Sequence, residues 1–167
     1  EETFHNQEIV ARAGFEANII ENHDQPRGAS LFIPEEDYGF YSLSALVTII
    51  FCERGLPFLY QGQEIGMSNR RWKYDEFNDL ETINQYQIAL KAGMSKEQAL
   101  EIAGHHSRDN ARTPMQWSSE ENAGFSKGKP WMPVNENYKV VNVAEEEKEY
   151  GSILNFYKRL IAFYKSE

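Results

Sequence analysis

The residues best able to do chemistry are Asn22, His23 and Asp24, which directly follow the short apolar stretch ANIIE at residues 17–21. A carboxylate and an imidazole at the end of a buried strand can both point into one pocket. There the carboxylate could act as a nucleophile, as a base, or as a stabiliser of a cationic transition state. A capping aspartate and a structural histidine in a turn produce the same pattern, so these residues alone leave both interpretations open.

Other catalytic and metal motifs do not compete with this one. The sequence contains no serine nucleophile elbow, no glycine-rich phosphate loop and no zinc-ligand spacing. His105 and His106 are adjacent, but no third ligand follows at useful spacing, so we expect neither a metal site nor a cofactor. Cys52, the single cysteine, cannot form an internal disulfide, and its apolar surroundings predict a buried packing role.

The sequence around these residues predicts a βαβ unit. Residues 17–21 and 57–60 have the character of short buried strands, and a polar loop follows each. Between them, residues 39–54 carry apolar side chains at helical spacing and end at Gly55 and Pro57. Barrel enzymes place their active sites on the loops that follow strands. Two parallel strands cannot close a sheet, so either more strands lie downstream or the chain is a piece of a larger fold.

Three more helices and one irregular segment are predicted downstream. Residues 74–92 are helical, with Leu80, Ile83, Gln87 and Leu90 on one side. A capping box at residues 95–98 opens a short helix that ends at residue 104. Residues 147–164 form the last helix, whose inward face is Ile153, Tyr157, Leu160, Ile161 and Tyr164. Residues 105–143 lack periodicity but contain two tryptophans, so we expect this segment to be ordered.

Composition restricts the class of protein. With 167 residues, 41% of them hydrophobic, the chain can fill one domain. A net charge of −9 argues against nucleic acid and anionic membranes as partners, and no stretch is apolar enough to span a bilayer. The N-terminal EETFHNQE is unlike a signal peptide, so a cytoplasmic location is expected. The 13% of aromatic residues suits a sugar ligand, although core packing is the commoner role of any single aromatic.

Five blocks of sequence, in order, resemble one enzyme family. They are ENHDQPR (21–27), GLPFLYQGQEIGM (55–67), DLETIN (79–84), RDNARTPMQW (108–117), and NAGFS followed by PW, VN and NY (122–138). Together they are similar to the oligo-1,6-glucosidase and dextran glucosidase branch of the α-amylase superfamily, glycoside hydrolase family 13. The first block alone indicates the superfamily, whereas RDNARTPMQW narrows the resemblance to this branch. It covers the chain from about Phe15 to the end.

The resemblance implies an α/β fold, a partial (β/α)₈ TIM barrel. The blocks are similar to the seventh strand and helix, the eighth strand, the irregular segment after it, and the last barrel helix. Residues 1–167 would then be the C-terminal part of the catalytic barrel, with no separate second domain and with the N-terminal part of the barrel as partner. The family's nucleophilic Asp and acid/base Glu follow strands four and five, so the chain alone is expected to be inactive.

The resemblance also implies site roles in retaining hydrolysis, which passes through an oxocarbenium-like transition state. Asp24 would be a third carboxylate that stabilises positive charge and binds the glucose at the cleavage point, and His23 would hydrogen-bond the same sugar. Arg108 would hold the non-reducing end of that glucose. Arg112 is the rival for this role, and a bracing salt bridge to Asp109 or to a neighbouring residue is the other explanation for Arg108.

Three further positions are interpreted from the same blocks. Glu81 matches a position near the aglycone side of the substrate. Glu64 is interpreted as a turn residue rather than as a partner that orients the site. Gln63 stands where many family members have Glu, which leaves substrate preference open.

The leading interpretation is an exo-acting α-glucosidase for short α-1,6- or α-1,4-linked oligosaccharides. Trehalose-6-phosphate hydrolases and sucrose isomerases share most of these blocks, so hydrolysis and isomerisation both stay open. A non-catalytic barrel subunit of a transporter is a different class, but it need not keep Asp24, His23 and Arg108. A lone carbohydrate-binding module does not account for the five blocks.

Overall fold

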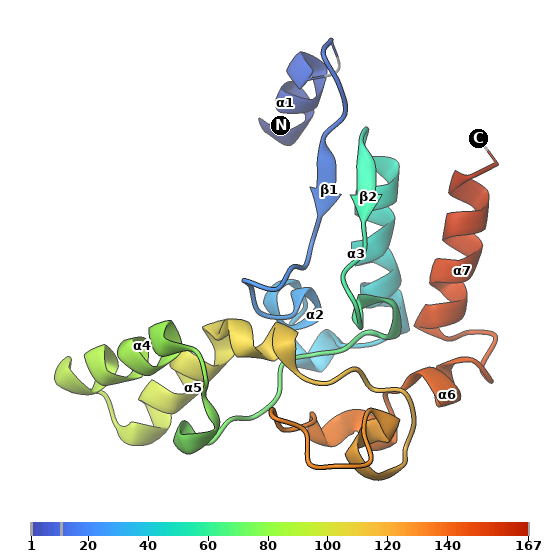
Figure 1. Ribbon diagram of the computed structural model, residues 1–167. Helices are drawn as coiled ribbons and strands as arrows, with labels where there is room; N and C mark the ends of the chain where they lie inside the picture. Colours follow the sequence, from blue (N-terminus) through green and yellow to red (C-terminus); the bar gives the residue numbers. More distant parts are fainter. Residues whose placement is uncertain (1, 11, 167) are drawn as a thin grey trace.

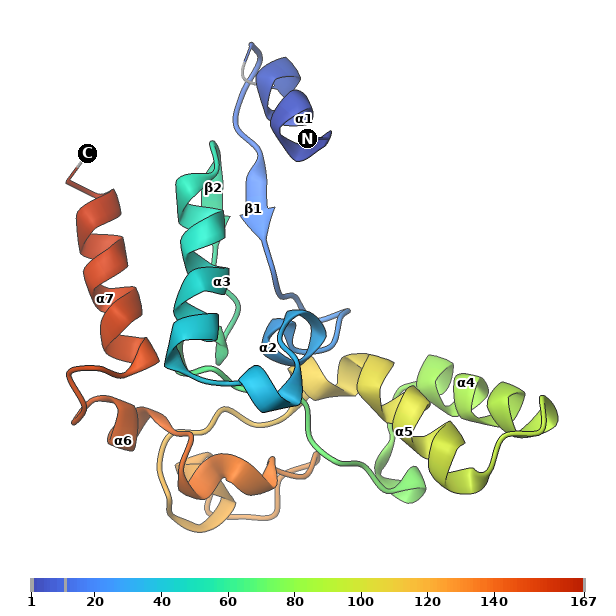
Figure 2. The ribbon, with the colours of Figure 1, turned by 180° about the vertical axis from the view of Figure 1, so that it is seen from behind.

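A computed structural model describes residues 2–10 and 12–166, and the predicted βαβ unit is present in it. β1 (Ala17–Ile19) and β2 (Leu56–Phe58) pair in parallel, with Ile19 opposite Phe58. α3 (Phe40–Cys52) lies between them in the chain and covers one face of the pair, as Figures 1 and 2 show. The two strands and this helix are therefore confirmed, although each is shorter than its sequence pattern suggested.

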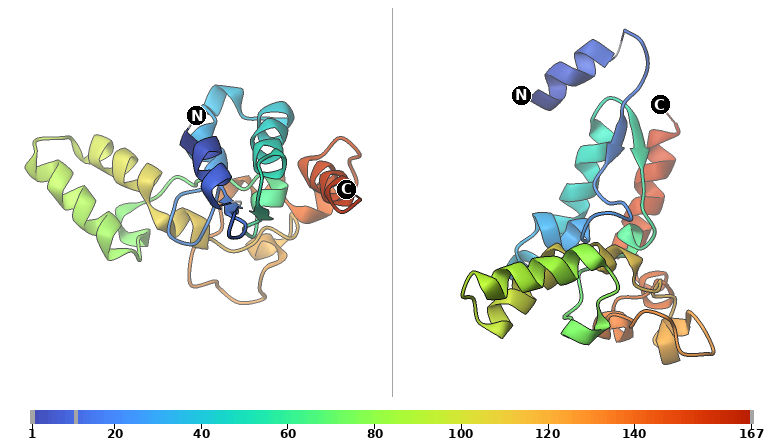
Figure 3. Two further views of the ribbon diagram at one scale, coloured as in Figure 1. Left: turned by 90° about the horizontal axis from the view of Figure 1, so that it is seen from above. Right: turned by 60° about the vertical axis from the view of Figure 1, so that its left-hand side comes forward.

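The remaining elements extend from this unit. α1 (Glu2–Val10) and α2 (Gly28–Phe32) were not predicted, because both are short and lack an apolar repeat. α4 (Leu80–Lys91) and α5 (Lys96–His106) form a hairpin that projects away from the strands (Figures 1 and 3). α6 (Val143–Glu146) and α7 (Ile153–Tyr164) bring the chain back beside α3. Short 3₁₀ helices are η1 (Glu35–Asp37), η2 (Gln63–Ile65), η3 (Tyr74–Glu76), η4 (Arg108–Arg112), η5 (Glu121–Gly124) and η6 (Glu136–Lys139).

The main apolar core lies between α3 and α7. Its buried members are Val47, Ile50, Phe51, Ile153 and Tyr157, and Leu43, Leu160 and Ile161 pack against them. This confirms Ile153, Tyr157, Leu160 and Ile161 of the face predicted for the last helix, whereas Tyr164 is 37% exposed. That helix begins at Ile153 rather than at residue 147, because the Ser152 side chain caps it by accepting a hydrogen bond from the backbone N–H of Asn155.

The buried face of α4 differs from the prediction. On the side predicted from the apolar repeat, Leu80 is 73% exposed and Leu90 packs against α5, whereas the buried side chains of this helix are Thr82 and Tyr86. Tyr86 packs in one cluster with Ala99 and Ala103 of α5. The two small alanines leave room for an aromatic ring, so the contact with α5 rather than the apolar repeat decides which face turns inward.

The ends of the hairpin helices are set by local caps. α4 begins at Leu80 instead of residue 74, because Asp79 caps its first turn and η3 precedes it as a separate turn. The capping box of Ser95 and Gln98 at the start of α5 is confirmed, and α5 runs two residues beyond the predicted end, to His106.

Cys52 is not the buried residue that its apolar surroundings suggested. It is exposed at the last position of α3. The helix turns Ile50 and Phe51 toward α7, which leaves Cys52 on the other side.

Arg27 forms a buried ion pair that joins three segments of the chain. Its Nη1 lies 3.2 Å from Oε2 of Glu21 and donates to the carbonyl of Gln61 at 2.6 Å, while its Nε donates to the carbonyl of Asn110 at 3.2 Å. The Arg27 and Glu21 side chains are 0% and 2% exposed. Burial raises the pKa of Glu21, although Arg27 acts against that shift. A Cβ at Gly28 would lie 3.0 Å from Cγ of Glu21, so a larger residue would press on the Glu21 side chain.

Side-chain amides organise the irregular segment, which is ordered as predicted. Asn110 is fully buried, accepts hydrogen bonds from Trp72 Nε1 at 2.7 Å and Arg70 N at 3.2 Å, and donates to the carbonyl of Gly104. Asn135 similarly donates to the carbonyl of Ser68 at 3.0 Å. Because the buried backbone groups lack a sheet or helix partner here, these amides supply the hydrogen bonds instead.

The face of the strand pair opposite α3 is apolar and open. Ile19, Leu56 and Phe58 are 50%, 51% and 53% exposed. Asn18 points the other way, and its Nδ2 donates to the carbonyl of Ile50 at 3.1 Å. A parallel sheet normally has both faces covered.

Within residues 2–10 and 12–166, none of the helices has the length and apolar character needed to cross a membrane.

The buried pair predicts a large stability cost for Glu21→Gln. The substitution keeps the shape of the side chain but leaves Arg27 buried without a counter-charge, which costs about 3–5 kcal/mol. The free energy of unfolding, measured with denaturant, should fall by that amount. Glu101→Gln, at an exposed position of α5, is the matched control and should change it by less than about 0.5 kcal/mol. Equal effects at the two positions would show that the pair does not hold the fold together.

Candidate active site

The loop after β1 presents His23 and Asp24 together at the surface. The Asn22 side-chain oxygen accepts a hydrogen bond from the backbone N–H of Asp24 at 2.8 Å, which shapes the turn. Nε2 of His23 lies 3.2 Å from Oδ2 of Asp24, and the two side chains are 72% and 53% exposed. The two residues that the sequence singled out therefore stand side by side at the carboxyl end of a parallel strand.

Both arginines of the RDNARTPMQW block reach Asp24. Arg112 Nη2 lies 3.0 Å and Arg108 Nη1 lies 3.4 Å from the same oxygen, Oδ1. Arg112 also donates from Nε to the carbonyl of His23 at 3.0 Å, so it holds the backbone of the loop. The sequence offered these arginines as rivals for one place. The structure brings both to Asp24, through the short turn η4.

Arg108 is anchored from behind by Asp79. Its Nε and Nη2 each lie 2.8 Å from Oδ1 of Asp79, whose side chain is 4% exposed. Burial acts to raise the pKa of Asp79, but hydrogen bonds from Arg108 and Thr82 outweigh it and hold that pKa below its usual value. The hydrogen bonds and charge of Asp79 in turn raise the pKa of Arg108.

The sequence did not identify Asp79 as the residue that braces Arg108, for which Asp109 or a neighbouring residue was suggested. Asp109 lies 4.0 Å from Nη1 of Arg112 and is the partner of that arginine instead. A signal for Asp79 was present, because it opens the DLETIN block and aspartate is a favoured N-cap residue, but the helix was predicted to begin earlier, at residue 74. Only the fold brings it to Arg108, 29 residues further along the chain.

Glu81, Glu64 and Gln63 stand apart from this cluster. Glu81 is exposed in the first turn of α4, and within the described residues no hydrogen bond joins it to Asp24, His23 or Arg108. Oε2 of Glu64 accepts from the backbone N–H of Gly62 at 2.8 Å, which fits a turn residue. Gln63 is buried and donates to the Tyr157 hydroxyl at 3.0 Å, so this departure from the family pattern serves the packing of η2 on α7.

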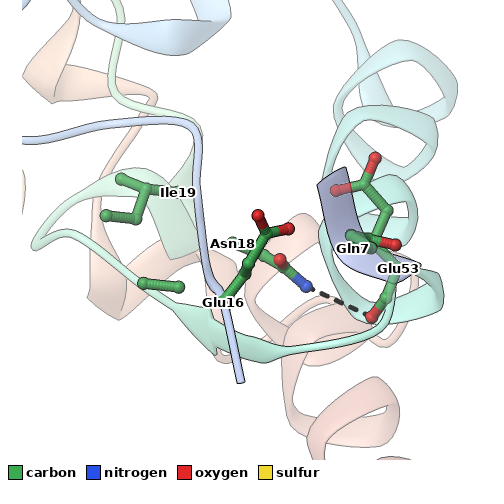
Figure 4. Close-up of a pocket in the computed structure, with 6 residues that line it drawn as sticks. Gln7, Glu16, Asn18, Ile19 and Glu53 are labelled. Atoms are coloured by element: carbon green, nitrogen blue, oxygen red, sulfur yellow. Dashed lines mark hydrogen bonds between the residues drawn. The ribbon is translucent and has the colours of Figure 1, made fainter. Parts of the chain in front are cut away.

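The hollow drawn in Figure 4 lies at a different place from the charged cluster. It is lined by Gln7, Glu16, Asn18, Ile19 and Glu53, near the start of β1, whereas Asp24 follows the end of that strand. Across residues 2–10 and 12–166, no group of three His, Cys, Asp or Glu side chains is arranged to hold a metal ion. We place the candidate site at Asp24 and the charged residues that contact it.

The cluster can bind hydroxyl groups and stabilise positive charge. Ion pairs between partly exposed side chains contribute little stability, so the contacts of Asp24 with the two arginines can be exchanged for ligand hydroxyls. The contact between Arg108 and the buried Asp79 is better shielded from water and keeps the guanidinium in place during such an exchange. A carboxylate, an imidazole and an arginine fork together offer both acceptors and donors to a polyhydroxylated ligand.

Comparisons with known proteins agree on one family. The protein-family model described as alpha amylase, catalytic domain, matches residues 1–167 of this chain. The oligo-1,6-glucosidase of Parageobacillus thermoglucosidasius is 41% identical over 161 residues, which cover 95% of this chain and 29% of that protein. A Bacillus licheniformis trehalose-6-phosphate hydrolase structure has a TM-score of 0.93 at 38% identity, over 99% of this chain and 30% of its own. A trehalulose synthase structure has a TM-score of 0.89 at 36% identity, over 99% of this chain and 30% of its own.

The lowered pKa of Asp79 predicts how stability depends on acid. Because this pKa lies below the unfolded value of 3.8, ionised Asp79 contributes stability that is fully present above that value. The contribution is lost as the pH falls through the lower folded pKa. The difference in unfolding free energy between the native protein and Asp79→Asn should thus be constant above about pH 5 and shrink below about pH 4.

The matched control for this measurement is Asp75→Asn. Asp75 is exposed in η3, and its side chain accepts no hydrogen bond from the described residues. The native protein and this variant should differ in unfolding free energy by less than about 0.5 kcal/mol, as expected of an exposed position. A difference for Asp79→Asn that grew toward low pH would reverse the predicted sign.

Proposed function

The chain belongs to the alpha-amylase family of catalytic domains, and from this premise we propose that it is the C-terminal part of the barrel of a retaining, exo-acting α-glucosidase. The substrates are short α-1,6- or α-1,4-linked glucosides. One observation carries the proposal: Asp24 follows a parallel strand, and Arg108 and Arg112 converge on its carboxylate at 3.4 Å and 3.0 Å. The oligo-1,6-glucosidases among the relatives are named for the same type of reaction.

In this proposal β1 and β2 are the seventh and eighth strands of a (β/α)₈ barrel. The open apolar face formed by Ile19, Leu56 and Phe58 then faces the barrel interior. The chain spans 29% of the length of an oligo-1,6-glucosidase relative, and the partner that completes the sheet is the N-terminal part of the barrel. α3 and α7 would belong to the outer ring of helices, which agrees with their packing on one side of the strands.

Asp24 stabilises the oxocarbenium-like transition state and binds hydroxyls of the glucose being released. The negative charge of its carboxylate favours a cationic sugar ring, and His23 hydrogen-bonds the same sugar. The nucleophile and the acid/base group come from the N-terminal part of the barrel, so the chain by itself does not turn over substrate.

Arg108 recognises the non-reducing end of that glucose. Its guanidinium is a planar fork that suits neighbouring hydroxyls, and a group that closes the far end of the site explains the removal of single glucose units. Arg112 shapes the loop, because its Nε holds the carbonyl of His23. Glu81 is assigned to the aglycone side on resemblance alone.

The names of the structural neighbours keep trehalose-6-phosphate hydrolysis and sucrose isomerisation as related reactions of the same barrel. Hydrolysis of short α-glucosides is preferred because the curated relatives quoted above carry that name. A transporter subunit without catalysis is disfavoured, because it has no need for a carboxylate and two arginines arranged around one point.

The proposal predicts a large catalytic defect for Asp24→Asn in the complete enzyme. The substitution keeps the shape and removes the charge, so kcat for an aryl α-glucoside should fall roughly a hundred- to thousandfold. The melting temperature should change little, because the Asp24 side chain is 53% exposed. Asp75→Asn serves as control and should leave kcat unaltered. Near-native turnover by Asp24→Asn would make Asp24 a structural residue.

The proposal also predicts that the two arginines fail differently. Arg108→Ala should lower kcat/KM for a disaccharide roughly ten- to hundredfold, the value of one charged hydrogen bond, and should harm a long dextran less. Arg112→Ala should harm both substrates alike and lower the melting temperature, because Arg112 holds the loop backbone. Parallel kinetics on both substrates with melting curves separate these outcomes. An unchanged substrate ratio for Arg108→Ala would remove that residue from glucose recognition.

A further inference from the structure

The two carboxylate oxygens of Asp79 have different partners. Oδ1 lies 2.8 Å from both Nε and Nη2 of Arg108. Oδ2 accepts from the backbone N–H of Thr82 at 3.1 Å and from its hydroxyl at 2.8 Å, which caps α4. One oxygen therefore serves the arginine and the other serves the helix.

Asp109 fixes the backbone that carries Asp79. It is fully buried, and its Oδ2 accepts from the backbone N–H groups of Asn78 at 2.8 Å and Asp79 at 2.9 Å. Its other oxygen, Oδ1, is buried without a hydrogen bond in the described residues, and Nη1 of Arg112 lies 4.0 Å away. The two aspartates thus stand behind the two arginines that reach Asp24.

The hairpin of α4 and α5 is closed at its base by the same network. Asp79 caps the start of α4, and Ser107 follows the end of α5. The Ser107 hydroxyl lies 2.9 Å from the Thr82 hydroxyl and accepts from the backbone N–H of Asp109 at 3.2 Å. The point where the hairpin joins the rest of the chain is therefore also the point that holds Arg108.

We propose that Asp79 is a positioning residue: it holds the Arg108 guanidinium beside Asp24 in the orientation that recognises the terminal glucose. The proposal rests on the function proposed above and adds how the recognition is set up. Arginine has many rotamers, so a free guanidinium would have to be ordered anew each time a substrate binds. A buried carboxylate that grips two of its nitrogens from the side away from the sugar removes this cost in advance.

The alternative is that Asp79 serves α4 only as a cap. Because Oδ1 contacts Arg108 and Oδ2 contacts Thr82, the two roles can be tested by separate substitutions. Asparagine is as good a cap as aspartate, so Asp79→Asn keeps an oxygen for Thr82 but turns an NH₂ group toward Arg108. Thr82→Val is the matched control, because it removes the hydroxyl from Oδ2 and leaves Oδ1 with Arg108.

The experiment measures kcat/KM of the complete enzyme for a disaccharide and for a long dextran. Asp79→Asn should lower the disaccharide value roughly ten- to hundredfold, by analogy with the loss of a residue that orients a metal ligand, and should harm dextran less. In the Arg108→Ala background it should cause less than about a twofold further change, because the two residues then act as one unit. Thr82→Val should lower the melting temperature and leave the substrate ratio unchanged.

The outcomes that overturn the proposal are distinct from a failure of the proposed function. If Arg108→Ala alters the substrate ratio but Asp79→Asn does not, or if the two losses multiply in the double variant, Asp79 is a cap and nothing more. If Arg108→Ala itself leaves the ratio unchanged, glucose recognition by Arg108 is wrong and the role of Asp79 falls with it. Should Asp79→Asn fold poorly, Asp79→Ser keeps a capping oxygen, removes the carboxylate, and is judged by the same ratio and the same double variant.

Discussion

The buried pair of Glu21 and Arg27 is the interaction on which the arrangement of this chain depends. Two charges taken out of water are tolerated only when each is paired and fully hydrogen-bonded. Arg27 meets that demand with the carboxylate of Glu21, the carbonyl of Gln61 and the carbonyl of Asn110. Those groups belong to the ends of both strands and to η4. Satisfying one guanidinium therefore places the loop after β1, the loop after β2 and the arginine-bearing turn beside one another.

Burial decides what each charged group of this region does. Glu21 and Arg27 are sealed from water and can only hold structure. Asp79 is nearly as buried, but its charged partner, Arg108, is 35% exposed. Asp24 is 53% exposed and lies at the end of the series. Ion pairs weaken with exposure because water screens them. The buried pair of Glu21 and Arg27 is therefore permanent, whereas a ligand can replace the contacts of Asp24 with the arginines.

The same logic explains why a segment that contains only short 3₁₀ helices is ordered. Residues 107–142 have no sheet to satisfy their backbone groups, so side-chain amides such as those of Asn110 and Asn135 take over. The apolar face of Ile19, Leu56 and Phe58 has no such solution within the described residues, because apolar side chains can be covered only by other apolar groups. The backbone groups of the irregular segment find hydrogen-bond partners within the segment and its neighbours. The open apolar face of the sheet requires another part of the protein to cover it, which the proposed barrel provides.

The sequence by itself determined what depends on neighbours along the chain. The βαβ unit, the cap of Ser95 and Gln98, and the pairing of His23 with Asp24 follow from apolar repeats and local turn chemistry. Only the tertiary structure decided which face of α4 is buried, that Cys52 is exposed, and that Asp79 rather than Asp109 anchors Arg108. An apolar repeat shows which side of a helix is apolar, but it does not show which segment will cover that side. Likewise, the contact between Asp79 and Arg108, 29 residues apart, forms only when distant segments pack together.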